Sequence, residues 1–161
     1  MARRVPSPAS AKADPAAALA RFLKANPGLL HVDAFLPDMN GNPRGKRFPA
    51  HEAAKIWTGG VQLPFCLYFL DATGEDLDPG GRSELRGDPD GNAWPVPGTL
   101  VPVPWAPEPT AQVLLTMPEQ ANQPCLVDPR QVLGQLAARF AKRGLTPVVA
   151  VEMEFYLMDR K

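Results

Sequence analysis

The sequence predicts an α+β fold in which a strand-rich unit is followed by a single helix and a final strand. Residues 29–36 alternate between two sets of side chains, which is the period of a β-strand. Asp-Pro pairs at residues 14–15 and 128–129 each precede a segment with apolar residues at helical spacing, as an N-cap and a first-turn proline do. Twenty prolines, concentrated between residues 79 and 129, favour irregular loops and short edge strands over long helices.

Length and composition limit the class of protein. A chain of 161 residues accommodates one ordinary domain and is short for two. With 17 basic and 17 acidic residues, it has no basic surface of the kind that binds nucleic acid or membranes. No apolar run approaches the roughly 18 residues of a membrane span, and Arg3-Arg4 lacks the apolar stretch of a secretory signal. Cys66 and Cys125 show no metal-ligand or disulfide pattern, so a cytoplasmic protein is expected.

The N-terminal third is expected to hold a disordered tail, a helix and a β-hairpin. The tail comprises residues 1–13, which are small, basic and contain Pro and Ser. The helix runs from residue 14 to about residue 24 and stops at the turn residues Asn-Pro-Gly. The hairpin pairs residues 29–36 with residues 43–48, because the PDMNG segment between them has turn chemistry.

The middle of the chain is expected to hold a short helix, three strands and one long loop. The helix is predicted at residues 51–58, before two glycines. The strands are predicted at residues 61–70, 99–103 and 110–117. Residues 71–97 are polar, acidic and rich in Gly, Pro and Asp, which indicates a long loop, and loops of this length are usually functional or disordered.

The last helix and the last strand are predicted from strong local signals. The helix begins after Asp128 and ends near Lys142-Arg143, with Gly144 as a C-cap residue. The segment 148–159 reads VVAVEMEFYLMD, and its β-branched and aromatic residues predict a buried strand. One helix and one strand bury too little apolar surface to fold alone, so the sequence predicts a truncated second unit.

Glu152 and Glu154 interrupt this final strand. In an extended chain, residues two apart share one face, so the two carboxylates would lie roughly 6 to 7 Å apart. Two like charges on so apolar a strand cost several kcal/mol unless Arg, Lys or a hard divalent metal neutralises them. A metal site is one interpretation of the E-x-E pattern. The other is a strand whose second face meets water, and the spacing alone favours neither.

Two other polar segments are candidate sites. The segment 41–47 resembles a phosphate loop, but its second glycine comes one residue early and Arg47 replaces the required Ser or Thr. The basic residues Arg44, Lys46 and Arg47 are interpreted as a solvated hairpin edge, and a binding role is the alternative. Asp71, at the predicted end of a strand where the long loop begins, is a candidate functional carboxylate. A turn-forming role is the alternative for Asp71.

Several motifs occur in a recognisable order along the chain. They are D-x-N-G-x-x-R-G-K-R at 38–47, D-G-N-A-W-P-V-P-G-T-L at 90–100, Pro104-Trp105, D-P-R at 128–130 and E-x-E-F-Y-L at 152–157. From about Leu29 onward, this order resembles the N-terminal part of the glutamine synthetase family. The resemblance is greatest to the γ-glutamylputrescine synthetase-like branch, which joins glutamate to amines.

The resemblance implies a β-grasp N-terminal domain at residues 14–118 and the first helix and strand of a truncated catalytic domain at residues 119–161. In that family, ATP phosphorylates the glutamate γ-carboxylate, and ammonia or an amine then displaces the phosphate. Two or three Mg2+ or Mn2+ ions occupy the active site, and the resemblance implies that Glu152 and Glu154 each bind one metal. It further implies that Asp71 reaches into a neighbouring subunit's amine site within a homo-oligomeric ring.

Two departures from the family pattern qualify these expectations. The segment Leu70 to Gly74 lacks the two serines of the family's ammonium-binding loop, which favours another amine. The remaining metal ligands and the ATP-binding and glutamate-binding residues of the family have no counterpart in the chain, so we expect the chain alone to be inactive. A non-catalytic β-grasp binding or assembly module is the alternative function, and a decayed product without function is a third.

Overall fold

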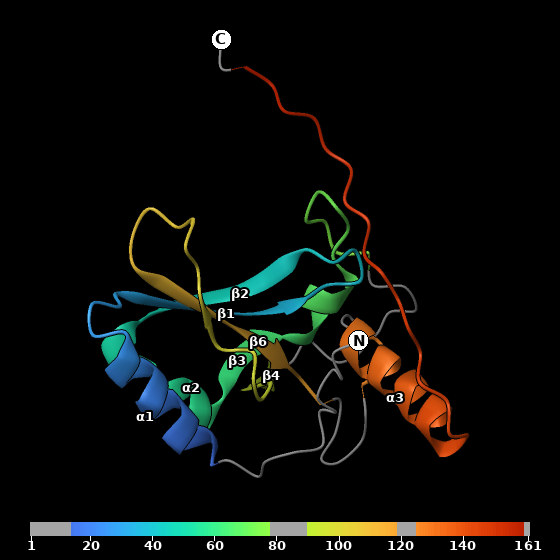
Figure 1. The fold of residues 1–161 in the computed structure, drawn as a ribbon, viewed down its shortest axis with the longest axis horizontal. Coiled ribbons are helices and arrows are strands. Elements are labelled where there is room, and N and C mark those ends of the chain that lie inside the picture. Colours follow the sequence, from blue (N-terminus) through green and yellow to red (C-terminus); the bar gives the residue numbers. More distant parts are fainter. Residues whose placement is uncertain (1–13, 78–89, 119–124, 160–161) are drawn as a thin grey trace, which may run out of the picture.

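The computed structural model describes residues 14–77, 90–118 and 125–159, and it contains three helices and a six-stranded sheet (Figure 1). In chain order the elements are α1 (Pro15–Ala25), β1 (His31–Pro37), β2 (Pro43–Pro49), η1 (Ala50–Glu52), α2 (Ala54–Gly59), β3 (Val61–Pro64), η2 (Phe65–Phe69), β4 (Asp90–Pro95), β5 (Val101–Pro102), β6 (Thr110–Thr116) and α3 (Pro129–Lys142). Helices and sheet are thus mixed, in agreement with the α+β prediction.

The sheet has the order β2-β1-β6-β4-β3, with β5 paired to β6. The central strands β1 and β6 run parallel, and the other pairs are antiparallel. Along β1, alternate side chains are fully buried at Val32, Ala34 and Leu36, as the period of two requires. Leu19 of α1 and Ile56 of α2 belong to the same core, and both helices lie on one side of the sheet in Figure 1.

The capping residues explain where the two long helices begin. The Asp14 carboxylate accepts a hydrogen bond from Ala16 N at the start of α1. The Asp128 carboxylate accepts hydrogen bonds from Arg130 N and Gln131 N at the start of α3. Each side chain satisfies amide groups that have no partner within the helix, so the Asp-Pro signals are confirmed. Within the described residues, no helix is long and apolar enough to cross a bilayer.

Three predictions for the middle of the chain are confirmed only in part. Residues 61–70 were expected to be one strand, but the strand ends at Pro64 and η2 follows. Residues 71–97 were expected to be a loop, yet β4 lies within them and pairs with both β3 and β6. The hydrogen bonds of β4 come from strands distant in sequence, and local propensity cannot reveal such partners. Of the strand expected at residues 99–103, only Val101–Pro102 forms.

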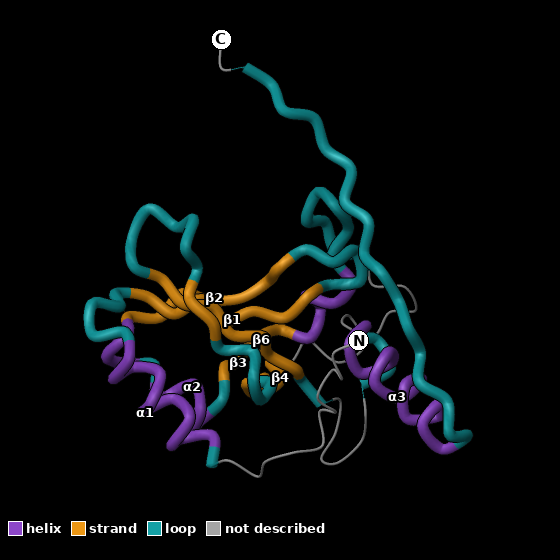
Figure 2. Tube along the Cα trace, in the orientation of Figure 1, coloured by secondary structure: helices purple, strands orange, loops and turns teal. Residues whose placement is uncertain are grey.

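The expected buried strand at residues 148–159 is also absent. The segment is extended but unpaired, and Figure 2 shows it as a loop leading away from the sheet. Val148 is 93% exposed and Tyr156 is 95% exposed. Among the described strands, none pairs with this segment, so nothing covers its apolar side chains. The tail at residues 1–13 and residues 78–89 of the expected loop lie outside the described residues.

Candidate functional site

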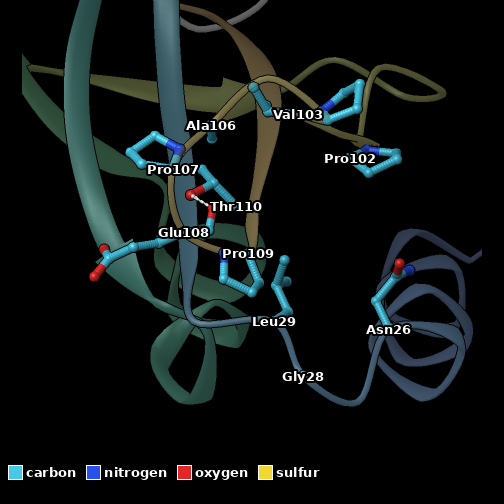
Figure 3. Close-up of a pocket in the computed structure, with 11 residues that line it drawn as sticks. Asn26, Gly28, Leu29, Pro102, Val103, Ala106, Pro107, Glu108, Pro109 and Thr110 are labelled. Carbon is cyan, nitrogen blue, oxygen red and sulfur yellow. Dashed lines mark hydrogen bonds between the residues drawn. The ribbon is translucent and has the colours of Figure 1, made fainter.

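One hollow lies between the end of α1 and the proline-rich loop that precedes β6. It has a volume of about 480 Å3 and is lined mainly by prolines and small residues of segment 102–110, with Asn26 and Leu29 opposite (Figure 3). Glu108 is the only charged residue in its lining, and its carboxylate pairs with the His31 ring nitrogen at 3.0 Å. This hollow therefore offers few reactive groups, and none of the site residues predicted from the sequence lies in its lining.

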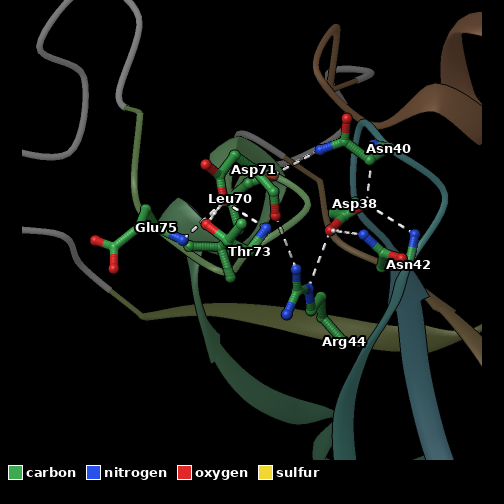
Figure 4. Close-up of polar contacts among 8 residues, drawn as sticks. All are labelled: Asp38, Asn40, Asn42, Arg44, Leu70, Asp71, Thr73 and Glu75. Atoms are coloured by element: carbon green, nitrogen blue, oxygen red, sulfur yellow. Dashed lines mark hydrogen bonds and ion pairs between the residues drawn. The ribbon is translucent and has the colours of Figure 1, made fainter.

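Asp71 lies in a closed loop between η2 and residue 77. One carboxylate oxygen, Oδ1, accepts hydrogen bonds from Thr73 N and Thr73 Oγ1, both at 2.7 Å, and from Glu75 N at 3.0 Å (Figure 4). The Asp71 amide donates to the Glu75 carbonyl at 2.9 Å, and Leu70 forms an isolated bridge with Asp76. Asp71 thus organises its own loop, as the turn-forming alternative requires.

The same contacts stabilise the charged form of Asp71. The Thr73 side chain has the largest effect, and with the Glu75 and Thr73 amides it lowers the pKa of the Asp71 carboxyl below its ordinary value of 3.8. The hydrogen bonds from Thr73 and Glu75 all fall on one carboxylate oxygen, Oδ1.

A buried carboxylate that the sequence analysis treated only as part of a turn lies beside this loop. Asp38, at the end of β1, is fully buried and pairs with Arg44 Nε at 3.0 Å. Its Oδ1 accepts from the Asn40 and Asn42 amides at 2.9 and 2.8 Å. Burial, the largest effect, raises the pKa of Asp38, but the hydrogen bonds from Asn42, Arg44 and Asn40 together lower it below the ordinary value.

This pair corrects the interpretation of the basic cluster as a solvated edge. Arg44 is 24% exposed at its side chain and neutralises a buried charge, which a surface residue does not do. Arg47 agrees better with the prediction, because its side chain is 54% exposed and forms two hydrogen bonds with Asp33 across the hairpin. The D-x-N-G-x-x-R spacing was the available signal for the Asp38–Arg44 pair, since a tight turn brings its first and last residues together.

Glu152 and Glu154 lie on the exposed C-terminal segment, away from any other candidate group. Within the described residues, neither forms a hydrogen bond or an ion pair, and no group of three His, Cys, Asp or Glu side chains is placed to hold a metal. Their carboxylate oxygens are ligands of the type that Mg2+ and Mn2+ prefer. The donor type therefore fits a hard metal, but the described residues do not complete a coordination sphere. The structure also shows no hydrogen bond or ion pair linking them to Asp71.

A second buried polar group, which the sequence analysis interpreted only as a helix cap, lies where α3 begins. Asp128 is fully buried, and its Oδ2 accepts hydrogen bonds from Tyr68, Thr116 and Gln131 side chains at 3.1, 2.7 and 3.1 Å. Gln131 also donates to the Met117 carbonyl. These contacts join α3 to β6 and η2. Their role is structural. Apart from the Asp-Pro pair, nothing in the sequence predicts them.

A family model matches the end of the chain. Residues 126–161 match the model described as glutamine synthetase, catalytic domain. The matched residues include α3 and the segment that carries Glu152 and Glu154.

Three curated proteins are similar over most of the chain. The chain is 40% identical over 141 residues to gamma-glutamylputrescine synthetase PuuA of Escherichia coli, which is 88% of this chain and 30% of that protein. It is 35% identical over 126 residues to gamma-glutamylethanolamide synthetase GlnA4 of Streptomyces coelicolor, covering 74% and 26%. It is 27% identical over 126 residues to a glutamine synthetase of Halobacterium salinarum, covering 76% and 25%. The chain therefore spans 25% to 30% of the length of these relatives.

Solved structures show a similar fold. A GmaS/ADP complex superposes with a TM-score of 0.58 at 24% identity, over 78% of this chain and 26% of that one. A novel glutamine synthase homolog superposes with a TM-score of 0.59 at 18% identity, over 71% of this chain and 27% of that one. At these identities the comparison concerns the fold alone.

Proposed function

This chain belongs to the glutamine synthetase family, in its γ-glutamylamine synthetase-like branch, and we propose that it is the N-terminal portion of an ATP-dependent ligase that joins glutamate to ammonia or an amine. The observation that carries the proposal is the 40% identity over 141 residues to a γ-glutamylputrescine synthetase. The names of two relatives make putrescine and ethanolamine the first amines to test. The segment Leu70 to Gly74 contains no serine, which also favours an amine over ammonia.

The proposed division of the chain is a β-grasp domain at residues 14–118 and the start of a catalytic domain at residues 119–161. A mixed sheet with a parallel central pair, packed against α1 and α2, supports the first part. The family match that begins at residue 126 supports the second. The exposed apolar side chains of α3 and of the segment after it agree with this division, since Leu133 and Phe155 are 65% and 74% exposed. Such side chains need a protein surface to cover them.

Glu152 and Glu154 are proposed as ligands of two Mg2+ or Mn2+ ions. Bound ions of this kind would neutralise negative charge on the phosphoryl group transferred from ATP to glutamate. The residues that complete each coordination sphere would come from the part of the relatives that this chain does not span. Because two carboxylates are too few to hold such an ion, we expect no ligase activity from this chain alone.

Asp71 is proposed to act at the amine site of a neighbouring subunit in a ring-shaped homo-oligomer. The hydrogen bonds of the loop support this role, because they lower the pKa of Asp71 further and stabilise the charged carboxylate. A charged carboxylate would attract the ammonium form of the amine and orient it toward the γ-glutamyl phosphate. A reaction that consumes ATP and glutamate favours the cytoplasm as its compartment.

The test compares this chain with the protein encoded by the complete reading frame, obtained by sequencing the DNA that follows the codon of Lys161. Each is incubated with glutamate, ATP, Mg2+ and either putrescine, ethanolamine or ammonia, and the γ-glutamyl product is detected by mass spectrometry. We expect product from the complete protein and none from this chain. Failure of the complete protein with all three nitrogen donors would overturn the proposed activity.

A non-catalytic assembly module is the second candidate, and the exposed apolar face of α3 favours it. The face comprises Val132, Leu133, Leu136 and Phe140, which are 37% to 65% exposed. Size-exclusion chromatography of this chain, with and without a full-length relative, separates the candidates. Entry of the chain into the relative's oligomer supports the module, whereas elution as a separate species in both experiments excludes it.

A further inference from the structure

The turn of the β1–β2 hairpin contacts the backbone immediately before and at Asp71. Arg44 Nη2 donates to the Asp71 carbonyl at 3.1 Å, and Asn40 Nδ2 donates to the Leu70 carbonyl at 2.9 Å (Figure 4). The Met39 amide donates to the Tyr68 carbonyl at 3.4 Å. All three acceptors are backbone carbonyls. The hairpin therefore fixes the position of the backbone that leads into the loop, and none of these contacts involves a side chain of the loop.

The buried carboxylate of Asp38 fixes both donor side chains. Its Oδ2 binds Arg44 Nε, which orients the planar guanidinium so that Nη2 faces the loop. Its Oδ1 accepts a hydrogen bond from the backbone amide of Asn40. This bond fixes the Asn40 backbone, so that the Asn40 side chain reaches the Leu70 carbonyl. A fully buried carboxylate with four hydrogen bonds cannot move without losing them, so the turn is a rigid support.

The loop itself is closed and compact. The three bonds to Asp71 Oδ1 and the bond from the Asp71 amide to the Glu75 carbonyl hold residues 71–75 together. A loop that is internally closed and attached at its base moves as one body about that base. The contacts from Arg44 and Asn40 therefore set the direction in which the Asp71 carboxylate is presented.

We propose that Arg44 and Asn40 are positioning residues, which hold the Asp71 loop in the orientation that the amine site requires. This inference rests on the proposed role of Asp71. It gives a function to the D-x-N-G-x-x-R part of the hairpin motif, in which Asp38 holds Arg44 while Arg44 and Asn40 bind the backbone of the loop. A positive charge at position 44 is not sufficient to hold the loop. The planar guanidinium of Arg44 must bind the Asp38 carboxylate and the Asp71 carbonyl at the same time.

The first experiment measures the loop in this chain. Arg44→Lys keeps the positive charge but removes the guanidinium that binds two acceptors at once. Asn40→Ala removes only the side-chain hydrogen bond to the Leu70 carbonyl and keeps the hydrogen bond from the backbone amide of residue 40 to Asp38. Arg47→Lys is the matched control, because Arg47 lies on the same strand, pairs with Asp33 and does not touch the loop. Backbone 15N order parameters of residues 70–76 should fall from about 0.85 toward 0.6 in the first two variants and stay unchanged in the control. Unchanged order parameters in both Arg44→Lys and Asn40→Ala would overturn the proposal.

The second experiment uses the same substitutions in the complete ligase. Arg44→Lys and Asn40→Ala should each raise KM for the amine about fivefold or more, as loss of one oriented hydrogen bond does, with KM for ATP unchanged. A substitution that merely unfolded the protein would lower activity toward all substrates and would lower the melting temperature. Another outcome is a fall in the order parameters with no change in KM for the amine. That result would refute the placement of Asp71 at the amine site, but it would support the attachment of the loop by the hairpin.

Discussion

The Tyr68 hydroxyl donates a hydrogen bond to Asp128 Oδ2 at 3.1 Å, and both side chains are fully buried. Sixty residues separate them in sequence. The Tyr68 oxygen also accepts a hydrogen bond from the Met117 amide at 3.3 Å, at the end of β6. This pair therefore joins the strand-rich part of the chain to the first turn of α3, which is the boundary between the two proposed domains.

Removal of the Tyr68 hydroxyl should destabilise the protein. Tyr68→Phe leaves Asp128 with the Thr116 and Gln131 donors but leaves the Met117 amide without its partner. We expect the free energy of unfolding to fall by about 1 to 3 kcal/mol in urea denaturation. Tyr156→Phe is the matched control, because Tyr156 is 95% exposed and should change stability by less than about 0.5 kcal/mol. Equal stability of the two variants would contradict the role of the buried pair.

Alkaline pH should weaken the fold through the same residue. Burial and, next, the charge of Asp128 raise the pKa of Tyr68 far above its ordinary value of 10.0. Below about pH 10 the folded and unfolded states both keep the proton; above it the unfolded state loses the proton first, so stability falls as pH rises. In Tyr156→Phe, Tyr68 is the remaining tyrosine. Phenolate absorbance should then rise together with loss of near-UV circular dichroism, whereas phenolate formation in the folded protein would contradict the prediction.

The two helix-capping aspartates should differ in their contributions. Asp128→Ala removes the cap of α3 and leaves the buried Tyr68 hydroxyl and the half-buried Thr116 hydroxyl without their acceptor. Asp14→Ala removes only an exposed cap that binds Ala16 N at 3.0 Å. Thermal and urea denaturation should show a loss of about 3 kcal/mol or more for Asp128→Ala and about 1 kcal/mol for Asp14→Ala. Similar losses would mean that the buried contacts contribute little.

Gly45 of the hairpin should not tolerate a side chain. A Cβ atom there would overlap the Ala34 carbonyl oxygen and lie 2.6 Å from Phe35 Cα, both on the neighbouring strand β1. Gly45→Ala should therefore destabilise the protein by about 2 kcal/mol or more, because backbone atoms must move. Gly134→Ala is the control in α3, where nothing lies within 4 Å, and it should stabilise by about 0.5 to 1 kcal/mol. Both effects can be read from denaturation midpoints.

Glu152 and Glu154 should matter to catalysis and not to the fold of this chain. Both are exposed and unbonded within the described residues, so Glu152→Ala and Glu154→Ala should leave the melting temperature of this chain unchanged. In the complete ligase each substitution should abolish formation of the γ-glutamyl product, because each removes one metal ligand. Glu108→Ala, in the proline-rich loop, is a control that should retain activity. Full activity of both glutamate variants would refute the metal assignment.

The sequence by itself determined the features that depend on neighbours along the chain. The capping aspartates locate the starts of α1 and α3, and the turn residues before Pro43 locate the β1–β2 hairpin. The order of the motifs was sufficient to identify the family. Several motifs spread along the chain must occur in that order, and this can be read without the structure. These signals are local, so they are readable before the chain folds.

Only the tertiary structure decided features whose partners are distant in sequence. Strand β4 forms in a segment of turn residues because β3 and β6 supply its hydrogen bonds, and residues 148–159 stay unpaired although their composition favours a strand. Arg44 and Asp128 became parts of buried networks, not a solvated edge and a simple cap. The physical reason is common to these cases. A strand or a buried charge is stable only when a partner satisfies its hydrogen bonds, and the fold alone determines which partners are present.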